Sequence, residues 1–118
     1  HDEVVPQKEL SYGRLTIKDT NPFLKLKLPS KFIRIESAEE LYEEGELNGN
    51  CVYSYLNKIN QEKCIIYTVL WRKRKYTIEI TIKDKKFQLE QIEGYNHSVA
   101  PQELKDRINK LLENQNVA

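Results

Sequence analysis

The sequence predicts an α+β domain in which an antiparallel sheet packs against helices. Residues 64–93 contain three alternating apolar runs separated by short charged turns, which is typical of a strand meander. Apolar residues with helical spacing occur before this meander, at 38–59, and after it, at 101–112. Alternation at 14–28 adds an N-terminal hairpin. The expected order is therefore β-β-α-α-β-β-β-α, with two central helices and a C-terminal helix against the sheet.

Length and composition fit one soluble domain. The chain has 118 residues, of which 39% are hydrophobic and 31% charged, and this length can bury a core without disulfides. We expect a flexible arm at residues 1–13 and a single domain at residues 14–118. The sequence has no methionine, which suggests a processed, tagged or excised domain. Without a long apolar run or a signal-peptide pattern, we expect a cytoplasmic protein with no membrane contact.

The N-terminal hairpin is expected from Arg14–Lys18 and Phe23–Leu28, which both alternate at period two. Residues 19–22, Asp-Thr-Asn-Pro, supply turn chemistry between them. Pro29 ends the second run. Residues 32–35 are interpreted as a short extended link.

Two central helices are expected next. Ser37 can cap the first helix, with Glu40 reaching back to complete a capping box. Gly45 and Gly49 favour left-handed backbone and are expected to stop this helix. A second helix should begin close to Cys51.

The meander and the last helix complete the domain. The expected strands are 64–71, 76–82 and 87–93, and the last helix begins near Pro101. Residues 113–118 are expected to fray. In simple register, Gln91 falls on the apolar face and needs a hydrogen-bond partner, whereas Glu79 falls on the other face. A pocket shared by these two therefore requires a twist, a bulge or converging loops.

Cys51 is the first candidate for chemistry. A thiolate at a helix N-terminus is stabilised by free N–H groups and the helix dipole. His97 or Glu79 could act as its base, and Asn96 could orient His97. The alternative is structural, because a lone cysteine on an apolar helix is usually a small buried residue. Structural alternatives also exist for Gln91, as a hydrogen-bond anchor, and for Glu79, as a solvated carboxylate.

A basic turn is the strongest charge feature. Four consecutive positive residues lie between Trp71 and Tyr76, and such a cluster could contact a phosphate backbone. The formal net charge is only +1, so nucleic-acid binding would depend on this local patch. The alternative is a solvated hairpin turn. The candidate residues are Arg72, Lys73, Arg74 and Lys75.

Metal and cofactor sites are not predicted. Two cysteines, at 51 and 64, are too few for a disulfide framework or zinc ribbon, and His97 has no ligand at metal-binding spacing. The spacing Gly45-x-x-x-Gly49 lacks the lysine and the preceding strand of a phosphate loop.

Three motifs stand out in the sequence. The first is Leu41-Tyr42-Glu43-Glu44-Gly45-Glu46-Leu47, followed by Asn50-Cys51-Val52-x-x-Tyr55. The second is the Thr77-x-Glu79 strand, and the third is Gln91-x-x-Gly94-x-Asn96. In order and spacing, over roughly residues 24–112, the chain resembles PcfJ-like proteins. Asn50 stands where the family has a histidine before its cysteine, which weakens a catalytic interpretation of Cys51.

The resemblance implies a protein of a bacterial mobile element, such as a conjugative plasmid or phage. We therefore expect a non-enzymatic accessory domain that binds DNA, RNA or a protein partner. The alternative is a small enzyme with Cys51 as nucleophile. In that enzyme, Glu79, Gln91 and Asn96 would form a polar pocket. The resemblance implies one constellation of Cys51, Tyr55, Glu79, Gln91, Gly94 and Asn96, within which we expect a binding pocket of Tyr55, Gln91, Gly94 and Asn96. A third interpretation is a protein-interaction domain that uses an exposed sheet face or edge strand.

Overall fold

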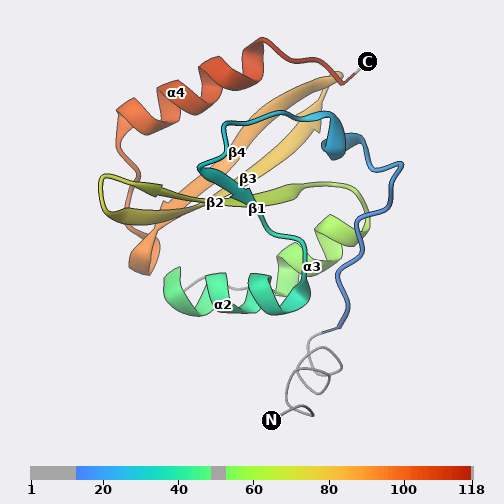
Figure 1. Cartoon of the computed structure of the whole chain (residues 1–118), viewed down its shortest axis with the longest axis horizontal. Coiled ribbons are helices and arrows are strands. Elements are labelled where there is room, and N and C mark those ends of the chain that lie inside the picture. Colours follow the sequence, from blue (N-terminus) through green and yellow to red (C-terminus); the bar gives the residue numbers. More distant parts are fainter. Residues whose placement is uncertain (1–12, 49–52, 118) are drawn as a thin grey trace.

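The computed structural model describes residues 13–48 and 53–117. Within them, an antiparallel sheet has the strand order β1-β2-β3-β4. One face of the sheet is covered by α2 and α3, and the other by α4 (Figure 1). The predicted α+β class is confirmed. The elements are η1 (Pro22–Lys25), β1 (Phe32–Arg34), α2 (Ala38–Asn48), α3 (Tyr53–Asn60), β2 (Ile65–Trp71), β3 (Arg74–Lys83), β4 (Lys86–Gly94), η2 (Tyr95–His97) and α4 (Gln102–Glu113).

The predicted N-terminal hairpin is wrong. Residues 14–18 have no regular structure, and Pro22–Lys25 forms the 3-10 helix η1. The Asn21 side chain accepts a hydrogen bond from the Phe23 N–H at 2.8 Å. An Asn cap followed by Pro stabilises the start of a helical turn, and this local preference prevails over the alternation. The fourth strand of the sheet is instead β1, which lies within residues 32–35, the segment that was expected to be a short extended link.

Both faces of the sheet are buried. The predicted apolar face packs against α4, through Leu104, Ile108 and Leu112. The second face packs against α2 and α3 through a smaller cluster. The first cluster includes Ile65, Tyr67, Val69, Tyr76, Ile78, Ile80, Phe87 and Ile92 from the sheet, and the second includes Ile35, Leu41, Leu56, Ile59, Cys64 and Ile66.

Two tight turns join the meander. Arg72 and Lys73 have φ values of 51° and 69°, and Asp84 and Lys85 have 54° and 63°. Positive φ at both central residues is the pattern of a type I′ turn, whose twist matches that of paired strands. The strands therefore extend further into the charged segments than the sequence indicates.

A β-bulge interrupts the pairing of β3 with β4. Ile80 lies opposite Leu89 and Glu79 lies opposite Gln91, so Glu90 is an extra residue in β4. Because side chains alternate along a strand, one extra residue moves Gln91 to the same face as Glu79. The expectation that Gln91 lies on the apolar face is wrong, and the bulge is the reason.

Ser37 caps α2 as expected, and Glu40 reaches back to the backbone N–H of the residue before the cap. The Glu40 N–H donates to Ser37 Oγ at 3.1 Å, while the Glu40 carboxylate accepts from the Glu36 N–H at 3.0 Å. The expected stop at Gly45 is wrong, because α2 continues to Asn48 with Gly45 buried inside it. The second stop, Gly49, lies outside the described residues.

The C-terminal tail is held against the domain, in contrast to the expected fraying. The Lys27 N–H donates to Gln115 Oε1 at 2.8 Å, and Gln115 Nε2 donates to the Lys27 carbonyl at 2.6 Å. The Val117 N–H donates to the Lys85 carbonyl at 3.1 Å. Asn116 also forms an isolated bridge with Lys86, so the tail lies beside the start of β4.

The lengths of the helices bear on membrane insertion. Among residues 13–48 and 53–117, no helix is long and apolar enough to cross a bilayer.

Candidate functional site

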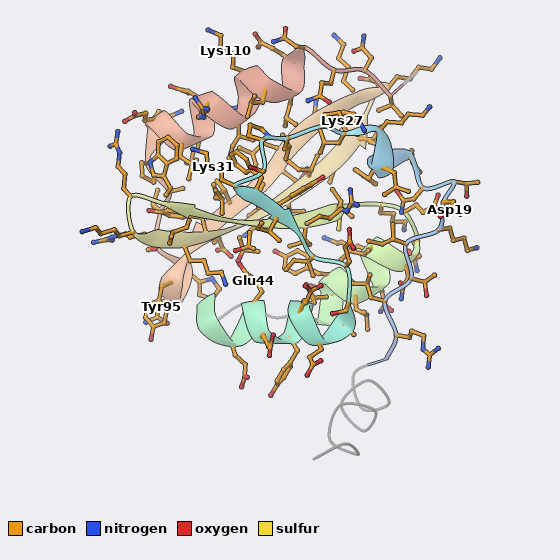
Figure 2. The ribbon with its side chains drawn as sticks, viewed as in Figure 1. Asp19, Lys27, Lys31, Glu44, Tyr95 and Lys110 are labelled. Atoms are coloured by element: carbon orange, nitrogen blue, oxygen red, sulfur yellow. The ribbon has the colours of Figure 1, made fainter. Side chains whose placement is uncertain are left out.

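A buried carboxylate links α2 to the sheet. Glu44 is 3% exposed and points from α2 towards β3 (Figure 2). Its carboxylate accepts a hydrogen bond from Thr77 Oγ1 at 2.5 Å and lies 3.4 Å from Lys75 Nζ. A buried carboxylate needs such partners to offset the loss of water. Glu44 and Thr77 both belong to the family-like motifs, so these motifs meet at the α2–sheet contact.

Glu79 forms a second buried group on the same face. It is 3% exposed and lies 3.7 Å from Lys58 Nζ on α3. Burial raises the pKa of the Glu79 carboxyl above its ordinary value, and the nearby Lys58 ammonium opposes this change only partly. Glu79 is therefore buried against α3, and the alternative that it is a solvated carboxylate is wrong.

Cys64 lies beside Glu79 and is fully buried. Burial, with a smaller contribution from the Glu79 charge, raises the pKa of the Cys64 thiol to about 12. The thiol is the nucleophile only when it is deprotonated, so Cys64 is inert at neutral pH. It serves as a small core residue beneath α3.

The bulge brings Gln91 to the rim of this polar face. Tyr55 Oη, on α3, donates to Gln91 Oε1 at 3.3 Å, and Gln91 is exposed on β4 opposite Glu79. The structure thus places three of the predicted polar residues, Tyr55, Glu79 and Gln91, on one side of the sheet. The hydrogen-bond partner that Gln91 was expected to need is thus the Tyr55 hydroxyl.

Gly94 and Asn96 shape the loop after β4. A Cβ atom at Gly94 would lie 2.5 Å from Ser98 Oγ and 2.9 Å from Tyr76 Cε1, so only glycine fits. Asn96 has φ 56° and ψ 39°, a left-handed conformation that asparagine tolerates better than most residues. The Gly94-x-Asn96 part of the motif therefore fixes backbone geometry, and Asn96 is exposed.

The candidate catalytic groups do not converge within the described residues. His97 Nδ1 lies 3.0 Å from a Glu93 carboxylate oxygen, whereas Glu79 pairs with Lys58. No contact joins His97 to Glu79 in residues 53–117. Cys51 and its neighbour Asn50 lie outside the described residues.

All four residues of the basic turn are exposed, and two of them form ion pairs. Arg72 makes a bidentate contact with Glu103 at 2.7 and 2.8 Å, and Lys75 pairs with Glu44. Lys73 and Arg74 are exposed, and no acidic residue in the described ranges lies within ion-pair distance of either. The charge available to a ligand is therefore about half of what the sequence suggests.

Tyr95 completes a groove beside these two residues. It is 68% exposed and projects beyond the sheet near the end of α2 (Figure 2). The groove has a volume of about 370 Å³. Sequence reasoning missed Tyr95, although an aromatic residue between Gly94 and Asn96 in a polar loop was a usable indication. Its lining residues are Lys73, Arg74, Lys75, Tyr76, Gly94, Tyr95 and Ser98.

Among residues 13–48 and 53–117, no group of three or more His, Cys, Asp or Glu side chains is arranged to hold a metal ion.

Comparison with known proteins identifies the family. The family model described as PcfJ-like protein matches residues 16–109, which cover most of the chain and include β1 to β4. No curated protein and no solved structure gave a match. The motifs at Glu44, Thr77, Glu79, Gln91 and Gly94 all fall inside the matched range, and the chain belongs to the PcfJ-like family.

Proposed function

We propose that this domain binds single-stranded nucleic acid in the groove between the β2–β3 turn and the loop after β4. One observation carries the proposal: the exposed cations Lys73 and Arg74 share this groove with the exposed ring of Tyr95. Cations that track phosphates beside an aromatic ring that stacks on a base are the usual components of a single-strand site.

The roles of the residues follow from their chemistry. Lys73 supplies a mobile point charge, and Arg74 supplies a planar fork suited to phosphate oxygens. Tyr95 offers a ring face for any base, so binding should depend weakly on sequence. The β2–β3 turn is held by the Arg72–Glu103 pair, which presents Lys73 at a fixed position.

The family context supports an accessory role. The resemblance to PcfJ-like proteins implies conjugative plasmids or phages, where single strands are handled during transfer and replication. We infer a non-enzymatic domain of a bacterial mobile element. Glu79 and Cys64 favour this inference over catalysis, because both are buried beneath α3.

Charge reversal at the groove tests the proposal. We expect Lys73→Glu with Arg74→Glu to weaken binding of a labelled oligo(dT) or oligo(U) of about 12 nucleotides at least tenfold. Loss of two phosphate contacts should also reduce the salt slope of log K by about 1.4. Fluorescence anisotropy at several potassium chloride concentrations measures both quantities. Tyr95→Ala should weaken binding, whereas Tyr95→Trp should retain it.

A matched control uses the opposite end of the sheet. Lys83→Glu with Lys86→Glu makes the same charge change at the β3–β4 turn, whose residues are also exposed. We expect a much smaller effect on affinity there. Equal losses from the two double variants would show that binding follows overall charge and would refute the groove.

A further inference from the structure

β1 is an edge strand with unpaired backbone groups. The Ile35 N–H donates to the Ile66 carbonyl at 2.9 Å. Since hydrogen-bonded residues alternate along an antiparallel strand, Ile33 also faces β2, and the N–H and C=O of Arg34 point away from the sheet. The Phe32 N–H is used by the Pro29 carbonyl at 3.0 Å. Outside the strand ladder, no hydrogen bond from another described residue reaches the Arg34 backbone.

A groove lined by both leucines and charged residues lies on one side of this edge. It has a volume of about 600 Å³, and Phe32 and Tyr67 from the sheet contribute to it. Leu24, Leu26 and Leu28 line it from the N-terminal segment. Arg34 also lies here, with its charge paired to Glu36 at 2.7 Å. Lys27, Glu36 and Glu40 also line this groove, so apolar side chains of a ligand would contact it mainly through the half-buried Leu24 and Leu28.

An acidic groove lies on the other side. It has a volume of about 640 Å³, with Ile33 and Ile35 among its apolar lining residues. Glu40, Glu43 and Glu46 of α2 line its wall, in addition to the Lys75–Glu44 pair. The excess of carboxylates favours cationic side chains.

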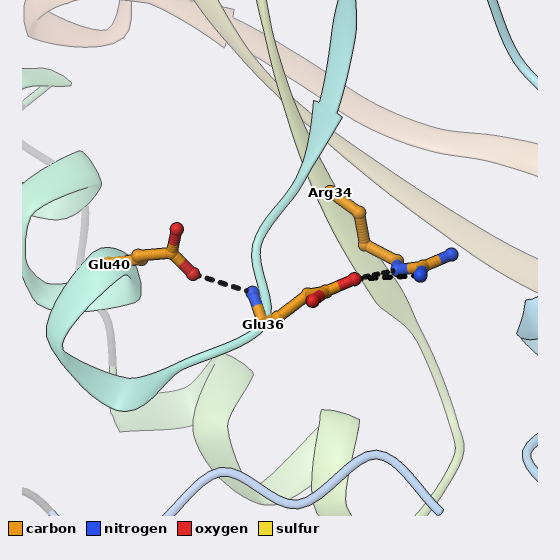
Figure 3. Close-up of polar contacts among 3 residues, drawn as sticks. All are labelled: Arg34, Glu36 and Glu40. Carbon is orange, nitrogen blue, oxygen red and sulfur yellow. Dashed lines mark hydrogen bonds and ion pairs between the residues drawn. The ribbon is translucent and has the colours of Figure 1, made fainter. Parts of the chain in front are cut away.

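The two grooves adjoin along β1. Ile33 and Glu40 line both of them, and Ile33 is 52% exposed. Figure 3 shows Glu40 and Arg34 on either side of the chain as it leaves β1, with Glu36 between them. A strand added to β1 would lie about 4.8 Å away, with side chains directed alternately to each groove.

We propose that β1 binds an extended peptide with alternating apolar and basic residues. The peptide pairs with the Arg34 backbone, places apolar side chains in the groove beside Phe32, and places lysine or arginine side chains near Glu43 and Glu46. Backbone pairing supplies affinity and the two grooves supply specificity, as in other cases of strand addition. This partner site is separate from the groove at Tyr95.

Peptide order provides the first test. A fluorescein-labelled peptide of alternating lysine and valine is compared by anisotropy with one in which all lysines precede all valines. We expect the alternating peptide to bind the intact chain at least tenfold more tightly. Equal affinities would show that charge alone is recognised and would overturn the proposal.

Backbone substitution at the edge provides the second test. Arg34→Pro removes the outward N–H, a position where an edge strand tolerates proline, and Arg34→Ala is the control for the lost side chain. We expect at least tenfold weaker binding for Arg34→Pro than for Arg34→Ala, with both variants folded by circular dichroism. Similar affinities for the two would refute backbone pairing.

A third test alters the alternating peptide and uses the unsubstituted protein. It therefore remains decisive if the Arg34→Pro variant does not fold. Two N-methylated peptides are compared, one methylated at the odd-numbered and one at the even-numbered backbone nitrogens. Because only one edge of the peptide pairs with β1, only one of these two peptides should lose binding. Glu43→Gln with Glu46→Gln should weaken binding and its salt dependence. Sedimentation that shows dimers through β1, with no displacement by peptide, would assign this edge to a second copy and overturn the peptide proposal.

Discussion

At the scale of residues, Glu79 and Glu44 are two buried carboxylates with different environments. Glu44 accepts a short hydrogen bond from Thr77 and pairs with Lys75. Glu79 lies farther from its ammonium partner, at 3.7 Å, and burial raises its pKa. A raised pKa means that the folded protein disfavours the charged form of Glu79. Folding stability is therefore lost as pH rises from the unfolded pKa through the folded pKa.

Removing the charge at Glu79 should reveal the loss of folding stability that accompanies ionisation of this buried carboxyl. Glu79→Gln retains the shape and removes the titration of this carboxyl. We therefore expect its free energy of unfolding, relative to the unsubstituted protein, to rise as the pH increases from the unfolded pKa through the raised folded pKa of Glu79. The lower end of this change lies at the ordinary pKa of a glutamate carboxyl, 4.5, which applies to the unfolded chain. Urea denaturation at each pH measures it. If the free energy of unfolding of Glu79→Gln instead fell relative to the unsubstituted protein as the pH rises, the attraction between Glu79 and Lys58 would outweigh the cost of burying the Glu79 charge.

At the scale of elements, the bulge in β4 determines which side chains face α3. Leu89 pairs with Ile80, and Gln91 pairs with Glu79, on opposite sides of the extra residue Glu90. A bulge leaves no periodic mark in the sequence, because alternation on either side of it is normal. This is why the regular register placed Gln91 on the wrong face, while the strands themselves were predicted correctly.

Deleting Glu90 should make the ladder regular without changing either neighbouring pair. The deletion loses the Thr81–Glu90 hydrogen bond at 3.2 Å, which is exposed, so we expect a cost of only about 1 kcal/mol. Deleting Gln88 shortens β4 equally, but it moves Glu90 to the apolar face opposite Ile80. That variant should lose considerably more stability in urea denaturation. Equal costs would contradict the register.

At the scale of the whole molecule, segments distant in sequence close the fold. Gln115 in the tail bonds both backbone groups of Lys27, 88 residues earlier. Glu103 on α4 holds Arg72, 31 residues earlier. These contacts connect the layer containing α4 to the N-terminal segment and to the β2–β3 turn, which carries the proposed nucleic-acid groove.

The tail contact should contribute to global stability. Gln115→Ala removes both hydrogen bonds to Lys27, and we expect a loss of about 1–2 kcal/mol, equivalent to a decrease in Tm of roughly 4–8 °C. Asn116→Ala is the matched control, since its side chain is exposed and has no hydrogen bond in the described chain. Calorimetry compares the two variants. An unchanged Tm for Gln115→Ala would indicate that the tail does not hold the fold together.

The candidate sites were predicted unevenly. Residue type and position identified the basic turn, and the motif spacing grouped Tyr55, Glu79 and Gln91 before their proximity was known. Pairing within the protein could not be foreseen, because Arg72 and Lys75 find their partners on α4 and α2. Tyr95 gained significance only when its loop was placed beside Lys73.

The sequence alone determined the features that depend on neighbouring residues: the alternating strands of the meander, the helix cap at Ser37, the apolar stripe of α4 and the motifs of the family. Their causes lie within a few residues, so pattern suffices to predict them. Tertiary structure decided the place of β1 at the sheet edge, the bulge at Glu90 and the burial of Glu44 and Glu79. These features depend on packing between distant segments, which local propensity does not encode.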